Sequence, residues 1–288
     1  MPPDLGWGGS LWDCLTLRRV DDAGNVSPVG SPPAEFVGLT AGRPLIFLVH
    51  GNGYTDADAM EEGLRARCGL LAAGGFAPGS VFVIFDWPSD RVYATPVRDL
   101  NEKSRRARVA GEHLARFVQA LPIGSQVCLL GHSYGGYVVL SALQLIAGGQ
   151  IEAERQEPAM RLEGGRPDLR LRAVTVEAAS SHHWLNPGER FEHALPACEA
   201  FLNVYNKFDK SLAVYILSRS TGVRPAIGRV GLRQNDLRKL GPQAARVRQI
   251  EVHDYFGSGH PTVGKLVAVP QFGAEVAVLT NFAPVSTP

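Results

Sequence analysis

A serine between glycines, at the junction of two apolar segments, is the residue of this chain best suited to nucleophilic chemistry. The five residues from Gly131 to Gly135 fit the pattern G-x-S-x-G, with Ser133 at the centre. The apolar run 126–131 predicts a buried strand, and the apolar segment 133–147 predicts a packed helix. A serine on so sharp a turn is held in a strained backbone conformation that exposes its hydroxyl. We therefore expect a nucleophile; the alternative is a turn serine that only caps the helix.

A serine hydroxyl becomes a nucleophile only beside a base, and two late histidines are the candidates. In an open α/β sheet, ligands and catalytic groups gather at the carboxyl ends of the strands. His253 and His260 lie at or beyond the last predicted strand, which falls within 246–256. We favour His260 because its glycine-containing loop is mobile enough to reach the serine, with Pro261 at a first helical position. His253 stays the alternative, although the pleat of the strand fixes the direction of its ring.

The base in turn needs an acid that orients it. Asp209 lies just past the carboxyl end of the predicted strand 199–206. The order of nucleophile, acid and base along the chain is then one known for hydrolases with an open α/β sheet. Glu177 and Asp86 also lie near strand ends and are the reserve candidates. The alternative role of Asp209 is that of a helix cap.

Acyl transfer also needs N–H groups that stabilise the developing oxyanion. The backbone N–H of Tyr134, directly after the nucleophile, is one expected donor. The second is expected from the glycine-rich segment after a predicted strand at 44–50. There we favour the backbone N–H of Asn52, with Gly53 as the alternative.

Strands and helices alternate along the chain and predict a single α/β domain, 1–288, with a mostly parallel sheet. The remaining elements of this pattern are strands at 80–87 and 171–179 and helices at 55–72 and 99–121. Ahead of them, the alternating segment 11–29 predicts an antiparallel hairpin.

Two segments interrupt the alternation and are expected to shape the pocket. Segment 149–170 is polar and predicts an exposed insertion or a small cap, whereas 181–198 is irregular. The histidines of the irregular segment lack the spacing of a metal site. Three aromatic residues are candidates for pocket walls, with packing in the core as their alternative role: Trp87, Tyr93 and Trp184.

The composition favours a soluble, cytoplasmic protein. A net charge of +1 gives no electrostatic basis for binding nucleic acid or a membrane surface, and the basic run 103–108 is expected on a solvated helix face. We find no secretory signal, and no run approaches the ~18 apolar residues of a membrane span. The four cysteines are expected to be free, buried thiols of a reducing compartment: Cys14, Cys68, Cys128 and Cys198. The sequence leaves the oligomeric state open.

Together these residues resemble the α/β-hydrolase superfamily over roughly residues 44–268. The chain is more narrowly similar to a bacterial α/β-hydrolase family of unknown function. The matching motifs are His50-Gly51, Trp87-Pro88-Ser89, His132 to Gly135, Tyr205 through Asp209 to Leu212, and Ser258 to His260. This resemblance also implies Asp209 and His260 as acid and base. Tyr134 stands where that family usually has methionine, so the pocket is expected to differ in shape.

The function expected from residues and resemblance is that of a serine hydrolase that cleaves a carboxylic ester through an acyl-enzyme. Its substrate is expected to be a small acyl compound, and its chemistry requires no metal or organic cofactor. A thioesterase, a lipase or an amidase would use the same residues. The alternative from another class is a catalytically idle α/β-hydrolase fold that serves only as a binding module.

Overall fold

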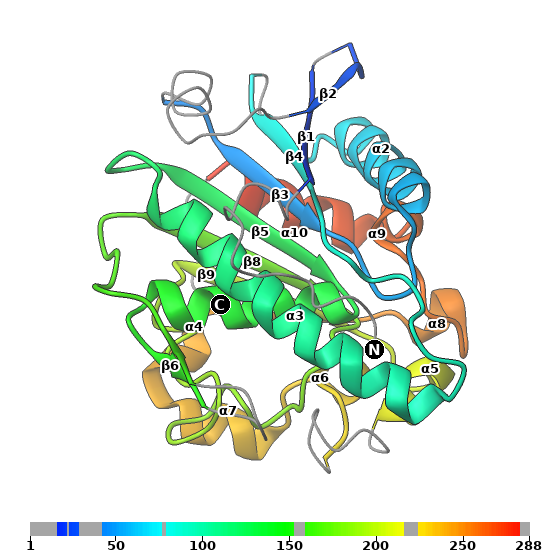
Figure 1. Cartoon of the computed structure of the whole chain (residues 1–288), viewed down its shortest axis with the longest axis vertical. Helices are drawn as coiled ribbons and strands as arrows, with labels where there is room; N and C mark the ends of the chain where they lie inside the picture. Colours follow the sequence, from blue (N-terminus) through cyan, green and yellow to red (C-terminus); the bar gives the residue numbers. More distant parts are fainter. Residues whose placement is uncertain are drawn as a thin grey trace.

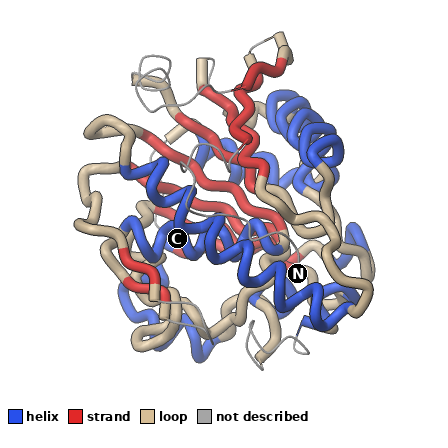
Figure 2. Tube along the Cα trace, viewed as in Figure 1, coloured by secondary structure: helices blue, strands red, loops and turns tan. Residues whose placement is uncertain are grey.

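A mostly parallel sheet of eight strands forms the centre of the chain, in the order β10-β9-β8-β5-β3-β4-β1-β2. The structure is a computed structural model that describes residues 16–21, 23–28, 42–76, 79–152, 159–215 and 224–282. The strands of this sheet are β1 (Thr16–Val20), β2 (Val26–Pro28), β3 (Leu45–Val49), β4 (Val81–Asp86), β5 (Gln126–His132), β8 (Arg170–Val176), β9 (Ala200–Tyr205) and β10 (Val247–Glu251). Helices lie on both faces of it (Figure 1, Figure 2), which confirms the predicted fold class.

One edge of the sheet is an antiparallel hairpin, and the rest is parallel. β1 pairs antiparallel with β2 and with β4, whereas the pairs from β4 through β3, β5, β8 and β9 to β10 are all parallel. The hairpin predicted within 11–29 is therefore confirmed; its residues 11–15, 22 and 29 lie outside the described residues. The parallel strands all end at one edge of the sheet, where catalytic groups are expected.

Helices bury both faces of the strands. They are α2 (Asp56–Ala72), α3 (Pro96–Gln119), α4 (Tyr134–Ile146), α5 (Lys210–Ala213), α6 (Ile227–Val230), α7 (Gln234–Leu240), η3 (Gly241–Arg246), α8 (His253–Phe256), α9 (Val263–Leu266) and α10 (Pro270–Thr280). Phe47 of β3 enters the core beneath α3 and α4, while its neighbour Leu48 enters the core beneath α2, α9 and α10. This double coverage explains why β3 and β4 are continuous apolar runs. In the described part of the chain, no helix is long and apolar enough to cross a membrane.

The segment 149–170 contributes a small ribbon rather than a wall of the cavity described below. Its strands β6 (Gln150–Ile151) and β7 (Met160–Arg161) pair antiparallel, and residues 153–158 between them lie outside the described residues. The ribbon follows the far end of α4, whereas Ser133 lies at its beginning. Segment 181–198 forms consecutive turns.

The basic run 103–108 on α3 is largely buried, so the predicted solvated helix face was wrong. Lys103 is 2% exposed and Arg106 7%. Nζ of Lys103 lies 2.9 Å from Asp99 Oδ2, and Nε of Arg106 lies 3.1 Å from Glu102 Oε1. Each charge meets a carboxylate one helical turn earlier, and this pairing permits its burial.

The cysteines only partly match the expectation of buried thiols. Cys128 and Cys198 are free and buried, whereas Cys68 of α2 is free and exposed. Cys14 lies outside the described residues. Cys68 was misjudged because it lies on the outer face of α2, which the helical period alone did not distinguish from the packed face.

Candidate functional site

Ser133 lies on a tight turn between β5 and α4. Its φ of 55° and ψ of −120° belong to a region that a residue with a side chain rarely adopts. Its N–H donates to the carbonyl of Val176 at 2.9 Å, which fixes the turn against β8. A Cβ at Gly135 would lie 2.2 Å from the carbonyl oxygen of Val49, and one at Gly131 would lie 2.3 Å from that of Gly135. Only glycine fits at both positions, as a nucleophile elbow requires.

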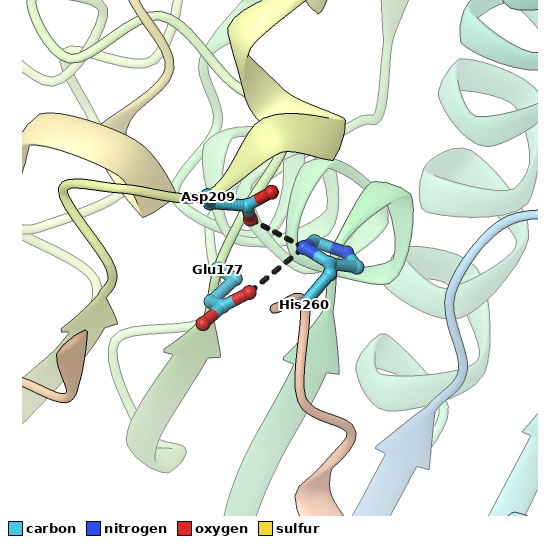
Figure 3. A group of neighbouring side chains, drawn as sticks. All are labelled: Glu177, Asp209 and His260. Carbon is cyan, nitrogen blue, oxygen red and sulfur yellow. Dashed lines mark hydrogen bonds and ion pairs between the residues drawn. The ribbon is translucent and has the colours of Figure 1, made fainter. Parts of the chain in front are cut away.

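His260 and Asp209 meet at the carboxyl ends of the strands (Figure 3). Nδ1 of His260 lies 2.5 Å from Oδ2 of Asp209 and donates a hydrogen bond to it. The other carboxylate oxygen of Asp209 accepts the N–H of Leu212 at 3.0 Å, so this residue also caps α5. The two roles weighed for Asp209 are thus compatible. The side chain of Asn206 holds the histidine loop by donating to the carbonyl of Gly259 at 2.9 Å.

Glu177, the reserve acid, lies beside the same nitrogen. Its Oε2 is 2.7 Å from Nδ1 of His260, and its side chain is fully buried at the end of β8 (Figure 3). One ligand-type atom from each of Glu177, Asp209 and His260 lies within 4.8 Å of the others. The hydrogen bond from Nδ1 to Asp209 already uses the nitrogen that a metal ion would need. We therefore treat the trio as a hydrogen-bonded acid–base group.

The three groups perturb one another's protonation. Burial raises the pKa of Glu177 to about 8, and the charge of Asp209 adds to this. Burial acts to raise the pKa of Asp209 as well, but the hydrogen bond and charge of His260 outweigh it and lower that pKa. Burial acts to lower the pKa of His260, but the adjacent carboxyl groups of Asp209 and Glu177 raise it to about 9. Such strongly coupled groups titrate as a unit.

His132 lies against the ring of His260. The two imidazole rings, His132 and His260, lie 4.8 Å apart between centroids. Burial lowers the pKa of His132 well below its usual value, so it is a neutral ring in this contact. A Cβ at Gly51 would lie 2.7 Å from Nδ1 of His132, which explains the glycine after His50. In the sequence, His132 was recognised only as part of the elbow motif.

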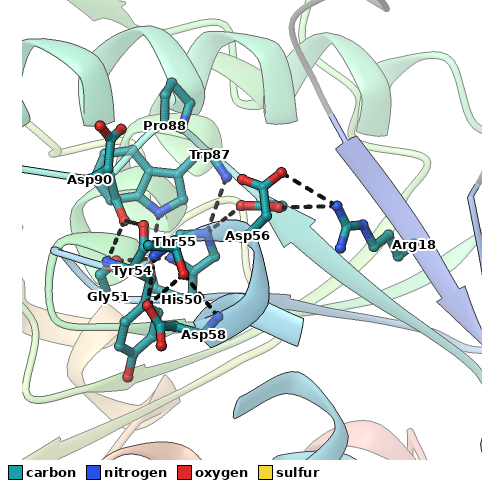
Figure 4. Close-up of polar contacts among 12 residues, drawn as sticks. Arg18, His50, Gly51, Tyr54, Thr55, Asp56, Asp58, Trp87, Pro88 and Asp90 are labelled. Carbon is teal, nitrogen blue, oxygen red and sulfur yellow. Dashed lines mark hydrogen bonds and ion pairs between the residues drawn. The ribbon is translucent and has the colours of Figure 1, made fainter. Parts of the chain in front are cut away.

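The segment after β3 is held by the Trp-Pro-Ser motif after β4 (Figure 4). The N–H of Gly53 donates to the carbonyl of Ser89 at 2.8 Å, and that of Tyr54 to the Ser89 hydroxyl at 3.1 Å. The indole N–H of Trp87 donates to the carbonyl of His50 at 2.9 Å. The N–H of Gly53, the alternative oxyanion donor, is therefore already engaged, which favours Asn52. The motif was visible in the sequence, but its role as a support for this loop was not.

Substitution of Ser89 by alanine is expected to lower kcat by about 10- to 100-fold, because a loop that loses one anchor would displace Asn52, the expected oxyanion donor. Steady-state kinetics on a nitrophenyl ester would measure this. The control is Ser125→Ala, which also removes a hydrogen bond to a backbone carbonyl, that of Pro122 at 2.7 Å. Equal rates for the two variants would contradict the role of Ser89.

The other reserve residues lie apart from the trio. Asp86 pairs through Oδ1 with Nε2 of His50 at 3.0 Å, and its Oδ2 lies 3.7 Å from Arg18 (Figure 4). Nδ1 of His253 lies 3.0 Å from Oε1 of Glu251. Asp86 is thus placed to orient His50 rather than His260, and His253 faces acids of its own segment.

The three aromatic residues expected as pocket walls do not line the cavity described below. Trp87 is buried and stacks on His50 at a centroid distance of 5.8 Å. Tyr93 lies beneath the guanidinium of Arg98, and Trp184 packs against Tyr137 in the core. Trp87 and Trp184 are buried and have the alternative role, packing in the core, whereas Tyr93 is only half-buried.

Ser133 and His260 open into one cavity of about 450 Å³. Asn52 lies at its wall as well. The other lining residues are Tyr54, Leu100, His132, Tyr134, Ala179, Ser211, Leu212, Val214, Tyr215 and Thr262. This wall contains no Lys, Arg, Asp or Glu among the described residues. A cavity of this kind fits an uncharged, largely apolar group.

A parallel sheet with an elbow serine after β5, an acid after β9 and a histidine after the last strand defines the α/β-hydrolase class of proteins. The model of the Alpha/beta hydrolase family matches residues 46–271, and the chain belongs to this family. No curated protein matches the chain.

Solved structures similar to this chain include two enzymes at low identity. An S-formylglutathione hydrolase from Agrobacterium tumefaciens has 15% identity over 83% of this chain and 85% of that one, with a TM-score of 0.42. A truncated carbohydrate esterase from gut microbiota has 14% identity over 82% of this chain and 86% of that one, with a TM-score of 0.41.

Proposed function

We propose that the protein is a serine hydrolase that cleaves carboxylic esters of small molecules through an acyl-enzyme. The observation that supports this most is the shared cavity of Ser133, strained at its elbow, and His260, whose Nδ1 is bound by a carboxylate. A binding module has no need for a strained serine, since strain is maintained where it serves a function. The hydrolase is therefore favoured over the idle fold.

In the proposed reaction, Ser133 Oγ attacks the ester carbonyl while Nε2 of His260 takes its proton. The imidazolium, stabilised by Asp209, then gives this proton to the departing alcohol oxygen, which leaves the acyl group on the serine. A water molecule attacks the acyl carbon, its proton passes to His260, and the acid is released with Ser133 restored. The backbone N–H groups of Tyr134 and Asn52 stabilise the oxyanion in both halves of the reaction.

The cavity supports an uncharged acyl group. Leu100, Leu212, Val214 and Tyr215 form an apolar wall close to the nucleophile. Burial of each methylene group of a substrate against such a wall contributes about 0.8 kcal/mol. A charged acyl group would lose its hydration there, and the described residues of this wall include no Lys, Arg, Asp or Glu that would compensate for it. Neutral esters are thus preferred, and thioesters and amides use the same groups.

Labelling with a fluorophosphonate tests the proposal directly. We expect one phosphonyl group per chain, located on the peptide that contains Ser133 by mass spectrometry, because only an activated serine reacts with this reagent. Hydrolysis of nitrophenyl esters of increasing chain length, followed in parallel, would then define the acyl preference. An unlabelled wild-type protein without esterase activity would contradict the proposed function.

A further inference from the structure

A catalytic triad requires one acid, yet two carboxyl groups face the same nitrogen of His260 (Figure 3). Oδ2 of Asp209 lies at 2.5 Å from Nδ1 and accepts its hydrogen bond, and Oε2 of Glu177 lies at 2.7 Å. Neither oxygen of Glu177 accepts a hydrogen bond from the described residues. The second carboxyl group is thus close to the base without serving as its acceptor.

The position of Glu177 is fixed by its backbone. Its φ is 45°, which is strained for a residue with a side chain. Its N–H donates to the carbonyl of Val204 at 2.8 Å, and a Cβ on Gly228 would lie 2.0 Å from its carbonyl carbon. β9 and α6 therefore hold this residue from two sides. The side chain is fully buried, so the carboxyl group cannot move away into water.

One oxygen of Glu177 and one oxygen of Asp209 lie within 4.8 Å of each other. Two buried carboxylates this close repel each other when both are ionised. The pair therefore keeps one proton at neutral pH, and burial with the neighbouring Asp209 charge places that proton on Glu177. The other titratable or charged groups around them are His132, a neutral ring whose centroid lies 4.8 Å from that of His260, and His50, which interacts electrostatically with His132. From α6, Arg229 Nε donates to the backbone carbonyl of Asp209 at 3.2 Å.

We propose that Glu177 is a positioning residue of the catalytic base: it shares a single proton with Asp209 and, once ionised, holds His260 in its protonated form. The inference rests on the proposed hydrolase function. When Glu177 ionises as the pH rises, its proton passes to solvent water, so no further reactant is needed. Glu177 in this way sets the pH above which the base can accept the serine proton.

The direction of the effect follows from the charges. His260 must be neutral to take the proton of Ser133, and the two carboxyl groups raise its pKa to about 9. The rate of serine phosphonylation should therefore rise with pH up to this value. In Glu177→Gln the amide cannot ionise, so the imidazolium loses one stabilising charge. The rising limb of the phosphonylation rate, plotted against pH, should then move to lower pH by roughly one unit or more.

A second consequence concerns the loss of Asp209. In Asp209→Asn, the like charge that kept Glu177 protonated is gone, so Glu177 ionises and replaces the missing acid. We expect this variant to lose about 10- to 100-fold in kcat/KM, and the double variant Asp209→Asn/Glu177→Gln to lose about 10⁴-fold, the loss typical of a triad without an acid. Equal losses in the single and the double variant would overturn the proposal.

Stability supplies a readout that needs no turnover. Glu177 has a pKa raised from 4.5 to about 8, so its neutral form is favoured in the fold and stability falls as pH rises from 4.5 through 8. In Glu177→Gln the side chain cannot ionise, so this loss of stability with rising pH disappears. The melting temperature of the variant relative to wild type should therefore increase by several degrees between these two pH values. A difference that is constant with pH would overturn the inference.

The closing experiment combines both pH series with a matched control. Glu251→Gln replaces a glutamate at the end of β10 that faces His253, with Oε1 and Nδ1 3.0 Å apart. This control should keep the wild-type pH limb and the wild-type melting profile. If wild type shows neither labelling nor esterase activity, the proposed function fails while the melting series still decides on the proton of Glu177. If wild type is active and Glu177→Gln has the same pH limb and a constant melting difference, only the role of Glu177 fails.

Discussion

Replacement of Ser133 by alanine is expected to lower kcat/KM for nitrophenyl esters by about 10⁶-fold, because no other group can form the acyl-enzyme. The fold should be preserved. Alanine has the same Cβ as serine and adopts the φ of 55° at the same cost, and the hydrogen bond to Val176 comes from the backbone. The melting temperature of the variant should therefore stay within a few degrees of wild type.

The matched control for this prediction is Ser211→Ala. Ser211 lines the same cavity as Ser133 but lies on α5, away from any strained turn. It should keep both fluorophosphonate labelling and esterase activity. Retained activity in Ser133→Ala, or loss of labelling in Ser211→Ala instead, would show that the elbow serine is not the nucleophile.

Replacement of His260 by alanine is expected to lower kcat/KM by about 10⁴-fold or more, whereas His253→Ala should remain near the wild-type rate. The structure gives the reason for the contrast. His260 is bound to Asp209 and opens into the cavity of Ser133. His253 lies between Glu251 and Asp254, at 3.0 and 2.9 Å from their oxygens.

Chemical rescue distinguishes a lost base from a damaged fold. Removal of the His260 side chain leaves room beside His132, against whose ring it packs. Free imidazole added to His260→Ala should therefore restore part of the esterase rate in proportion to its concentration, since a diffusible base can enter that space. A rate in His253→Ala as low as that expected for His260→Ala would transfer the role of base to His253.

Much of the architecture followed from local sequence patterns. Continuous apolar runs marked β3 and β4, because strands covered on both faces are apolar at every position. The glycines on either side of Ser133 marked the elbow, because only glycine permits the close backbone contacts there. Asp209 and His260 were found because parallel strands deliver their next residues to one edge of the sheet. These predictions used only interactions between residues close in sequence or the general topology of parallel sheets.

The prediction failed where burial depends on what packs over a helix or an edge. Lys103 and Arg106 resembled a solvated face because their helical period is that of a surface. Their burial depends on pairing with acids one turn earlier and on tertiary contacts such as that of Arg106 with the carbonyl of Pro88. Trp87 resembled a pocket wall, but its indole anchors the loop after β3 from beneath. The local pattern of a single sequence does not reveal which neighbours cover such residues.

The sequence alone determined that this chain forms an open α/β sheet with an elbow serine, because strand, turn and helix each have a recognisable pattern over consecutive residues. Tertiary structure alone decided that two carboxyl groups meet one imidazole. Glu177, Asp209 and His260 lie in three separate segments of the chain. The distances of 2.7 and 2.5 Å from Nδ1 of His260 to Glu177 Oε2 and Asp209 Oδ2 depend on how β8, β9 and the histidine loop pack together. Their shared proton has the same origin, since only burial at that short distance makes one carboxylate prevent the ionisation of the other.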